Sequence, residues 1–269
     1  MNTAFQNIAG MREVVPDITV TIVFHCEGSY VVPALGSMKR LVEITRDAGI
    51  VVETRALLDK ANDETRHLVS LRGAWLDDIC EVSFGDLGLT RNYGAQIASG
   101  RFLSFLDGDD LWGSEWLTKA FLCAVENPTS IWHPEVLFFF NESDYDHHIH
   151  SMTILPSRQA QSHFMRHKSS TDEDFDKNSI FLENPWSANV FAAREIHLSH
   201  PYKAVDKSSG NGFEDWSWNH ETFAAGIHHC VTYDTVHLIR QKDHGSLGRS
   251  LASEGFLPFI PHGLFPTLG

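Results

Sequence analysis

Apolar residues in the first half of the chain follow two alternating patterns. Runs rich in β-branched residues, such as Ile18 to Phe24, are typical of buried strands. Residues 31–48 place apolar side chains at helical spacing and end at Gly49, a residue type that commonly follows a helix. The pattern also predicts strands at 51–58, 80–84 and 102–106, and helices at 63–75, 88–99 and 115–127. This alternation is typical of βαβ units and predicts an α/β fold with a Rossmann-like, mainly parallel central sheet flanked by helices.

The pattern changes after Asn127. Shorter elements follow: strands at 131–133, 136–140, 188–193, 228–231 and 236–240, helices at 157–167 and 214–225, and a charged, mobile loop at 169–177. We therefore expect one domain (1–269) with a front half at 18–127, a smaller mixed half at 128–250 and a tail at 251–269.

Charge and composition exclude several classes of function. The 21 basic and 35 acidic residues leave a net charge of −14, which argues against nucleic acid or an anionic membrane as the main partner. The four cysteines form no C-x-x-C pair, so a zinc ribbon or a redox motif is not indicated. Without a signal peptide or a membrane-length apolar run, we expect a cytoplasmic protein. Peripheral association with the inner face of the cell membrane, or a larger multidomain parent, stays open.

Three carboxylates follow the apolar run 102–106, in the order Asp107-Gly108-Asp109-Asp110. Open α/β sheets bind ligands at the carboxyl ends of their strands. Mg²⁺ and Mn²⁺ prefer carboxylate oxygens and often share them with substrate phosphates. A metal site that holds a phosphorylated substrate is one interpretation of this segment. The alternative is an acidic turn that caps the next helix.

Further motifs fall in order around this segment. The first strand ends in His25-Cys26-Glu27, the second ends at Asp59, and the run from Gly88 to Asp110 precedes a Glu214-Asp215 pair. Over roughly residues 18–250 this series resembles the family 2 glycosyltransferases, which are inverting enzymes of the GT-A fold. The resemblance implies that 18–127 binds a nucleotide-sugar and that 128–250 binds the acceptor.

The resemblance assigns nucleotide-binding residues. Asp59 matches the family's base-binding aspartate, although an Asx turn after the strand is the alternative. Arg91 matches an arginine near the diphosphate, where a guanidinium suits phosphate oxygens; the alternative is a solvated helix residue. His25, Glu27 and Gly108 are predicted to line the same site.

The resemblance also implies a Mn²⁺ or Mg²⁺ ion. Asp107 and Asp109 match the family's DxD motif, with Asp109 as metal ligand and Asp107 at the ribose or the metal. His244 is the expected third ligand and His237 the fallback, although His244 stands further from Arg240 than relatives place it. Asp110 is a further candidate for this site, although a cap for the helix at 115–127 is the favoured role.

Inversion requires one general base beside the acceptor hydroxyl. Asp215 matches the last residue of the family's xED motif, which has that role, and Glu214 is expected to orient an acceptor hydroxyl or to pair with a cation. Favourable charge in the first turn of a helix is the alternative explanation of both.

Other polar and aromatic residues have weaker patterns. The cluster 146–150 contains three histidines and suggests zinc, but a solvated loop is favoured. Lys203, Lys207 and 210–212 are expected to form a flexible acceptor loop. Trp186, Trp216 and Trp218 are expected in the core.

Together these features predict a metal-dependent, inverting hexosyltransferase that acts on a glycan or lipid-linked glycan in surface polysaccharide synthesis, with UDP-sugar as the default donor. A sugar-phosphate nucleotidyltransferase is one alternative, but residues 25–30 lack the glycine-rich, basic loop that such an enzyme needs. A non-catalytic glycan-binding module is the other.

Overall fold

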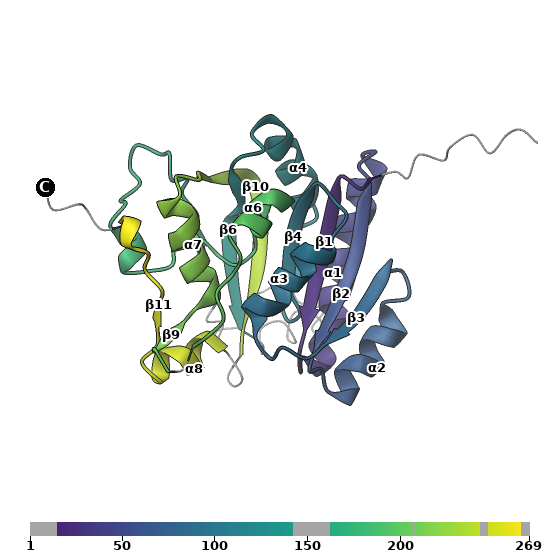
Figure 1. Cartoon of the computed structure of the whole chain (residues 1–269). Coiled ribbons are helices and arrows are strands. Elements are labelled where there is room, and N and C mark those ends of the chain that lie inside the picture. The colour runs from purple at the N-terminus through teal and green to yellow at the C-terminus, as the bar shows by residue number, and fades with distance from the viewer. Residues whose placement is uncertain (1–14, 142–161, 207, 243–246, 265–269) are drawn as a thin grey trace, which may run out of the picture.

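The computed structural model describes residues 15–141, 162–206, 208–242 and 247–264 (Figure 1). The strands are β1 (Ile18–Phe24), β2 (Val52–Asp59), β3 (Asp78–Val82), β4 (Phe102–Asp107), β5 (Leu111–Trp112), β6 (Ile131–Asn141), β7 (His163–Arg166), β8 (Phe191–Ala193), β9 (Asn211–Gly212), β10 (His229–Gln241) and β11 (Leu257–Pro258). The helices are α1 (Val31–Asp47), α2 (Asp63–Arg72), α3 (Leu87–Ile97), α4 (Trp116–Glu126), α6 (Arg194–Ser199), α7 (Glu214–Ala224) and α8 (Leu247–Ser253), with short 3₁₀ turns at Gly28–Tyr30, Ser179–Phe181 and His262–Leu264.

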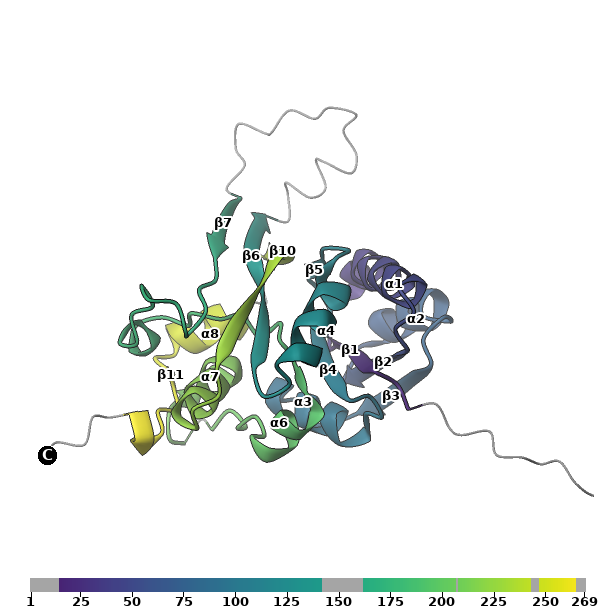
Figure 2. The ribbon, with the colours of Figure 1, turned by 90° about the horizontal axis from the view of Figure 1, so that it is seen from above.

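In the described part of the chain, one large sheet has the order β3-β2-β1-β4-β8-β6-β10-β5, with β7 beside β6. Strands β3, β2, β1 and β4 are parallel, as are β6 and β10, whereas β8 is antiparallel to both β4 and β6. The sheet is therefore mostly parallel and confirms the predicted α/β class. Seen from above, β6, β7 and β10 curl away from the plane of the first four strands (Figure 2).

Helices cover both faces of the sheet. Helices α1, α2 and α4 pack on one face, while α3, α6 and α7 lie on the other (Figures 1 and 2). All seven residues of β1 are buried, as expected for a strand with a helical layer on each side. The second half of the chain adds strands to this same sheet, so the predicted halves share one core.

The parallel register brings separate polar segments to one edge of the sheet. Phe24, the last residue of β1, pairs with Leu58, and Val23 pairs with Asp107. The residues that follow β1, β2 and β4 therefore meet along the lower edge in Figure 1, where α7 also begins. The sequence predicted this edge correctly because parallel strands share one direction.

Several predicted elements differ in the structure. The two strands predicted at 131–140 form one strand, β6, and those predicted at 228–240 form β10, whose pairing shifts between Thr232 and Val236. The helix predicted at 157–167 is wrong where the chain is described, because 163–166 is strand β7, paired with β6. Residues 169–177 lack helix and strand as predicted, but Ser169 and Ser170 hydrogen-bond to β10.

A buried histidine gives the core a pH-dependent stability. His197 is 2% exposed and stacks on Trp218 and Tyr202, and neither ring nitrogen has a hydrogen-bond partner within the described residues. Burial, with a smaller contribution from Arg91, lowers the pKa of His197 to about 3 from 6.5. Because the unfolded chain binds this proton at a higher pH, His197 costs stability as the pH falls below 6.5, until protonation of the folded state near pH 3.

We expect His197→Phe to be close to wild type in stability at pH 7.5. Between pH 6.5 and pH 3 its free energy of unfolding should exceed that of wild type by about 1.4 kcal/mol for each pH unit. Urea unfolding at pH 7.5 and 5.5 measures this difference. The exposed His163→Phe is the control; an equal pH dependence in both variants would contradict the prediction.

Candidate active site

A pocket of about 380 Å³ lies where the carboxyl end of β4 meets the amino end of α7. Its charged lining combines Arg91 from α3, Asp107 from β4, and Glu214 and Asp215 from α7. The other lining residues are Leu87, Asn184, Ala188, Phe213, Trp216, Gly248 and Leu251. Four residues predicted from distant motifs are thus brought together around one space.

Arg91 joins the two sides of this pocket. Its side chain is 1% exposed, and its two terminal nitrogens lie 2.7 Å from Oδ1 of Asp107 and 2.8 Å from Oε1 of Glu214. Burial alone would lower the pKa of Arg91, but the two carboxylates raise it above its usual value. Arg91 was predicted at the diphosphate; in the structure it is a buried link between β4 and α7, and the solvated alternative is wrong.

The start of α7 directs two carboxylates to the pocket. Phe213, just before the helix, has φ 55° and ψ 68°, a left-handed conformation that non-glycine residues rarely adopt. The chain then enters α7 with Glu214 buried and Asp215 half-buried. Burial raises the pKa of both carboxyl groups, and the nearby Arg91 opposes this. Such carboxylates are stronger bases than exposed ones, which suits proton abstraction near neutral pH.

Asn184 is a site residue that the sequence did not reveal. Its Nδ2 donates a hydrogen bond of 2.9 Å to Oδ2 of Asp215. Asn184 lies in the irregular segment between the turn at Ser179–Phe181 and β8, without a recognisable motif around it. Only the packing of that segment on α7 places it in the site.

A second charged cluster surrounds Asp109. The Nζ of Lys242, at the end of β10, lies 2.6 Å from Oδ2 of Asp109, and the Nε of Arg240 donates to its backbone oxygen. Burial, together with Asp110, raises the pKa of Asp109 to about 6 although Lys242 opposes the shift. The sequence did not reveal Lys242 as a site residue. Lys242 reaches Asp109 only because β10 pairs with β5, directly after the turn that carries Asp109.

Asp110 does not cap a helix. One of its carboxylate oxygens accepts a hydrogen bond from the backbone N–H of Arg240, and the other lies 3.0 Å from Nε2 of His237. Helix α4 begins later, at Trp116, with Glu115 in the capping position. The predicted capping role is therefore wrong, and Asp110 instead ties the acidic turn to β10. His237, the fallback metal ligand, lies at this 3.0 Å contact, although neither of its ring nitrogens has a hydrogen-bond partner within the described residues.

The described donors suit a divalent cation only in part. No group of three His, Cys, Asp or Glu side chains within the described ranges could hold a metal by itself. Magnesium-type sites in phosphate-binding enzymes need one or two carboxylates plus phosphate oxygens, and Asp107 and Asp109 can supply these. The negative charge at Asp109 is already balanced by the ammonium of Lys242, which shows that a cation fits there. A metal ion would have to displace Lys242.

Asp59 has a structural role in this arrangement. It is 5% exposed, and its carboxylate accepts hydrogen bonds from the backbone of Gly85 and Asp86 and from the hydroxyl of Thr90. These contacts shape the loop that leads into α3. The donors lie 26, 27 and 31 residues further along the chain, so this is not the Asx turn considered as the alternative. Contact of Asp59 with a nucleotide base stays a prediction.

The other predicted nucleotide-binding residues border the cluster around Asp109. His25 lies in the exposed turn after β1, with its Nδ1 2.6 Å from the backbone oxygen of Asp59. Glu27 accepts a hydrogen bond from the backbone of His25, and burial raises its pKa, with Asp109 adding to the effect. Gly108 is required for packing, because a Cβ there would lie 2.3 Å from a ring carbon of Phe24.

Some predicted residues lie outside the described part of the chain. These are the third metal ligand His244, the cluster 146–150 and Lys207. Among the tryptophans, Trp186 and Trp218 are buried in the core, as predicted, and Trp216 is half-buried at the pocket.

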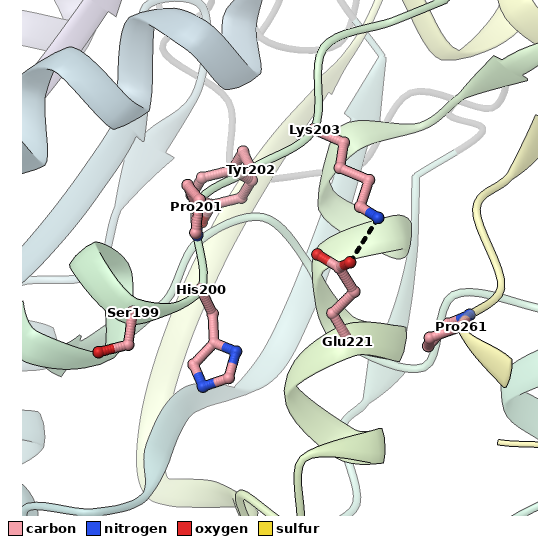
Figure 3. Close-up of a pocket in the computed structure, with 7 residues that line it drawn as sticks. All are labelled: Ser199, His200, Pro201, Tyr202, Lys203, Glu221 and Pro261. Atoms are coloured by element: carbon pink, nitrogen blue, oxygen red, sulfur yellow. Dashed lines mark ion pairs between the residues drawn. The ribbon is translucent and has the colours of Figure 1, made fainter. Parts of the chain in front are cut away.

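A separate pocket of about 370 Å³ lies beside α7 and is lined by Ser199, His200, Pro201, Tyr202, Lys203, Glu221 and Pro261 (Figure 3). The ammonium of Lys203 lies 2.6 Å from Glu221 of α7 and 3.3 Å from the centre of the Phe259 ring. Lys203 is thus held against α7, which does not fit the flexible acceptor loop predicted for it.

Comparison with known proteins agrees with this geometry. The model of the family "Glycosyl transferase family 2" matches residues 20–188. No curated protein sequence matches the chain. Solved structures share the fold at low sequence identity. TarS 1-349 from S. aureus in complex with UDP-GlcNAc has a TM-score of 0.59 at 13% identity, and the alignment covers 88% of this chain and 66% of that chain.

Two further structures extend the comparison. GalNAc-T7 with UDP, GalNAc and Mn²⁺ has a TM-score of 0.56 at 16% identity and covers 86% of this chain and 45% of that protein. The mannosyltransferase PcManGT from Pyrobaculum calidifontis, with GDP-Man and Mn²⁺, has a TM-score of 0.55 at 13% identity, with coverages of 86% and 58%. The chain therefore spans only 45% to 66% of the length of these three solved chains. No helix in the described ranges has the length and apolar character needed to cross a bilayer.

Proposed function

The chain belongs to glycosyl transferase family 2, and from that premise we propose that it transfers a sugar, with inversion, from a nucleotide-sugar to an acceptor hydroxyl. The observation that carries the proposal is the pocket in which Asp107, at the end of β4, faces the Glu214–Asp215 pair across Arg91. An inverting displacement needs two features on opposite sides of one space: a place for the leaving diphosphate and a base for the acceptor.

Asp215 is the proposed general base. It takes the proton from the acceptor hydroxyl as that oxygen attacks the anomeric carbon, while the bond between this carbon and the diphosphate oxygen breaks. The electron pair of the broken bond leaves with the nucleoside diphosphate. Glu214 is 7% exposed and bound to Arg91, so it holds the start of α7 in place and is not itself the base.

Asp109 and Asp107 are the proposed holders of a divalent cation, Mn²⁺ or Mg²⁺, with His244 as a further candidate. When bound, the ion would supply Lewis-acid stabilisation of the charge on the departing diphosphate. The ammonium of Lys242, 2.6 Å from Asp109 in the structure, would have to move aside for that ion. His25 and Glu27, at the same sheet edge, are proposed to border the nucleotide.

A UDP-sugar is the proposed donor, since the TarS structure similar to this chain contains UDP-GlcNAc. The acceptor is proposed to be a glycan or a lipid-linked glycan in surface polysaccharide synthesis, with the protein in the cytoplasm or at the inner face of the membrane. Residues 128–250 are proposed to contact that acceptor.

A thermal-shift panel tests the donor. UDP, GDP, dTDP and CDP are each added with Mn²⁺, and UDP should raise the Tm most, because a ligand at 100 times its Kd stabilises the folded state by about 2.7 kcal/mol. Release of UDP from UDP-GlcNAc then tests the chemistry. A protein that binds none of the four nucleotides would contradict the proposed function.

We expect Asp109→Asn to lose metal-dependent UDP binding. An amide is a weaker cation ligand than a carboxylate, so UDP affinity in Mn²⁺ should fall at least about tenfold, which corresponds to 1.4 kcal/mol. Titration calorimetry with UDP measures it, in Mn²⁺ and in EDTA. Asp47→Asn, an exposed change at the end of α1, is the control. Equal affinity of wild type in Mn²⁺ and in EDTA would remove the metal from the proposal.

A further inference from the structure

We propose that Asn184 is the positioning residue of the general base Asp215, and that Asn219 fixes the orientation in which Asn184 acts. The role given to Asp215 rests on the proposed function. The contacts between Asn184, Asn219 and Asp215 are independent of it.

Helix α7 holds the segment that carries Asn184 at two points. The indole N–H of Trp216 donates to the backbone oxygen of Ile180 at 2.8 Å, and Nε2 of His220 lies 2.7 Å from the same oxygen. Further along, Nδ2 of Asn219 donates to the backbone oxygen of Trp186 at 2.9 Å. The segment from Ile180 to Trp186 is therefore attached to α7 on both sides of Asn184, which sets its distance from Asp215.

The hydrogen bonds of Asn219 decide which way the amide of Asn184 points. The backbone oxygen of Trp186 can only accept, so the atom of Asn219 that faces it must be the NH₂ group. That same NH₂ group contacts Oδ1 of Asn184 at 2.8 Å. The remaining end of the Asn184 amide is then its own NH₂ group, which faces Oδ2 of Asp215. Asn219 is 2% exposed, so water does not compete for these bonds.

This relay has two effects on Asp215. It holds the carboxylate in one orientation at the edge of the pocket, and it donates a hydrogen bond that favours the ionised form, which a base requires. The charged groups around Asp215 act in both directions. Burial and Asp107 raise the pKa of Asp215, whereas Arg91 lowers it and so favours ionisation. The amide of Asn184 is a neutral donor. Its hydrogen bond therefore adds to the effect of Arg91 on the pKa of Asp215 without burying a further charge.

The test uses Asn184→Ala and Asn184→Asp in the full chain, with UDP release from UDP-GlcNAc in Mn²⁺ as the readout. We expect kcat to fall about 10- to 100-fold in Asn184→Ala, because a displaced base loses its alignment. The acid limb of the kcat/KM profile should move up by about one pH unit in Asn184→Ala, since a hydrogen bond to the ionised form is lost. It should move further in Asn184→Asp, because two adjacent carboxylates share a proton.

Controls separate positioning from general loosening of the fold. Asn178→Ala, an exposed change just before this segment, should leave the rate and the pH profile unchanged. UDP affinity should stay within about twofold of wild type in all three variants. The carboxylate in Asn219→Asp cannot donate a hydrogen bond to Asn184, so this variant should show the same pH shift as Asn184→Ala. If this buried change prevents folding, the variants Asn184→Ala and Asn184→Asp are sufficient to test the proposal.

An unchanged acid limb in both Asn184 variants, or a loss of rate that matches a loss of UDP affinity, would overturn the proposal. Failure of the proposed function has a different signature. In that case wild type would release no UDP from UDP-GlcNAc, or Asp215→Asn would retain full activity, whatever the Asn184 variants do.

Discussion

Replacing Asp215 by asparagine is expected to reduce sugar transfer by a factor of about 10² to 10⁴ while the protein folds and binds UDP as wild type does. The amide has the size of the carboxylate and can still accept the hydrogen bond from Asn184. It cannot take a proton from the acceptor hydroxyl. Donor affinity should change little, because Asp215 lies on α7, across the pocket from Asp107 at the end of β4.

The measurement compares the rate of UDP release with the affinity for UDP in one preparation of each variant. Burial raises the pKa of Asp215, so the wild-type rate should fall as the pH drops through that raised pKa and the base becomes protonated. Glu214→Gln is the comparison variant, with a smaller loss of rate expected because Glu214 acts through Arg91. Near-normal transfer by Asp215→Asn would remove Asp215 from the mechanism and leave Glu214 as the candidate.

The largest expected effect on stability comes from Arg91→Met, which should cost about 3–5 kcal/mol of unfolding free energy. Methionine replaces the apolar stem of the arginine side chain but leaves Glu214, which is 7% exposed, without its cation. Asp107 is 29% exposed, so water compensates part of its loss. Most of the cost should therefore come from Glu214.

This loss should depend on pH in a defined direction. Without Arg91, the pKa of Glu214 should rise above the value of about 7 that burial and Asp215 already give it. A folded-state pKa above the unfolded value of 4.5 stabilises the protein at low pH, and that contribution is lost as the pH rises through the folded pKa. The deficit of Arg91→Met should be larger at pH 8 than at pH 6, as urea unfolding can measure. A deficit below about 1 kcal/mol at pH 8 would show that Arg91 is not the link between β4 and α7.

The local pattern of apolar residues was sufficient to predict most helices and strands in the first half of the chain. Short apolar runs and helical spacing located β1, β2, β4, α1 and α3 to within a few residues, because each buries a face that its own side chains define. The pattern failed at 157–167, where the prediction was a helix and residues 163–166 pair with β6 instead. Strand pairing depends on a partner elsewhere in the chain, and local spacing carries little information about it.

The sequence by itself determined the family and the α/β class, because motif order and the alternation of strands and helices are local features. The resemblance to the family implied that the Glu214–Asp215 pair faces the strand end at Asp107. Only the tertiary structure decided the role of each side chain there. It showed that Asp59 holds the loop before α3, buried Arg91 between two carboxylates, and brought Lys242 to Asp109 and Asn184 to Asp215. The physical reason is that burial, charge and hydrogen bonding depend on neighbours distant in the chain, and those neighbours exist only after β10 and α7 have packed against the first sheet half.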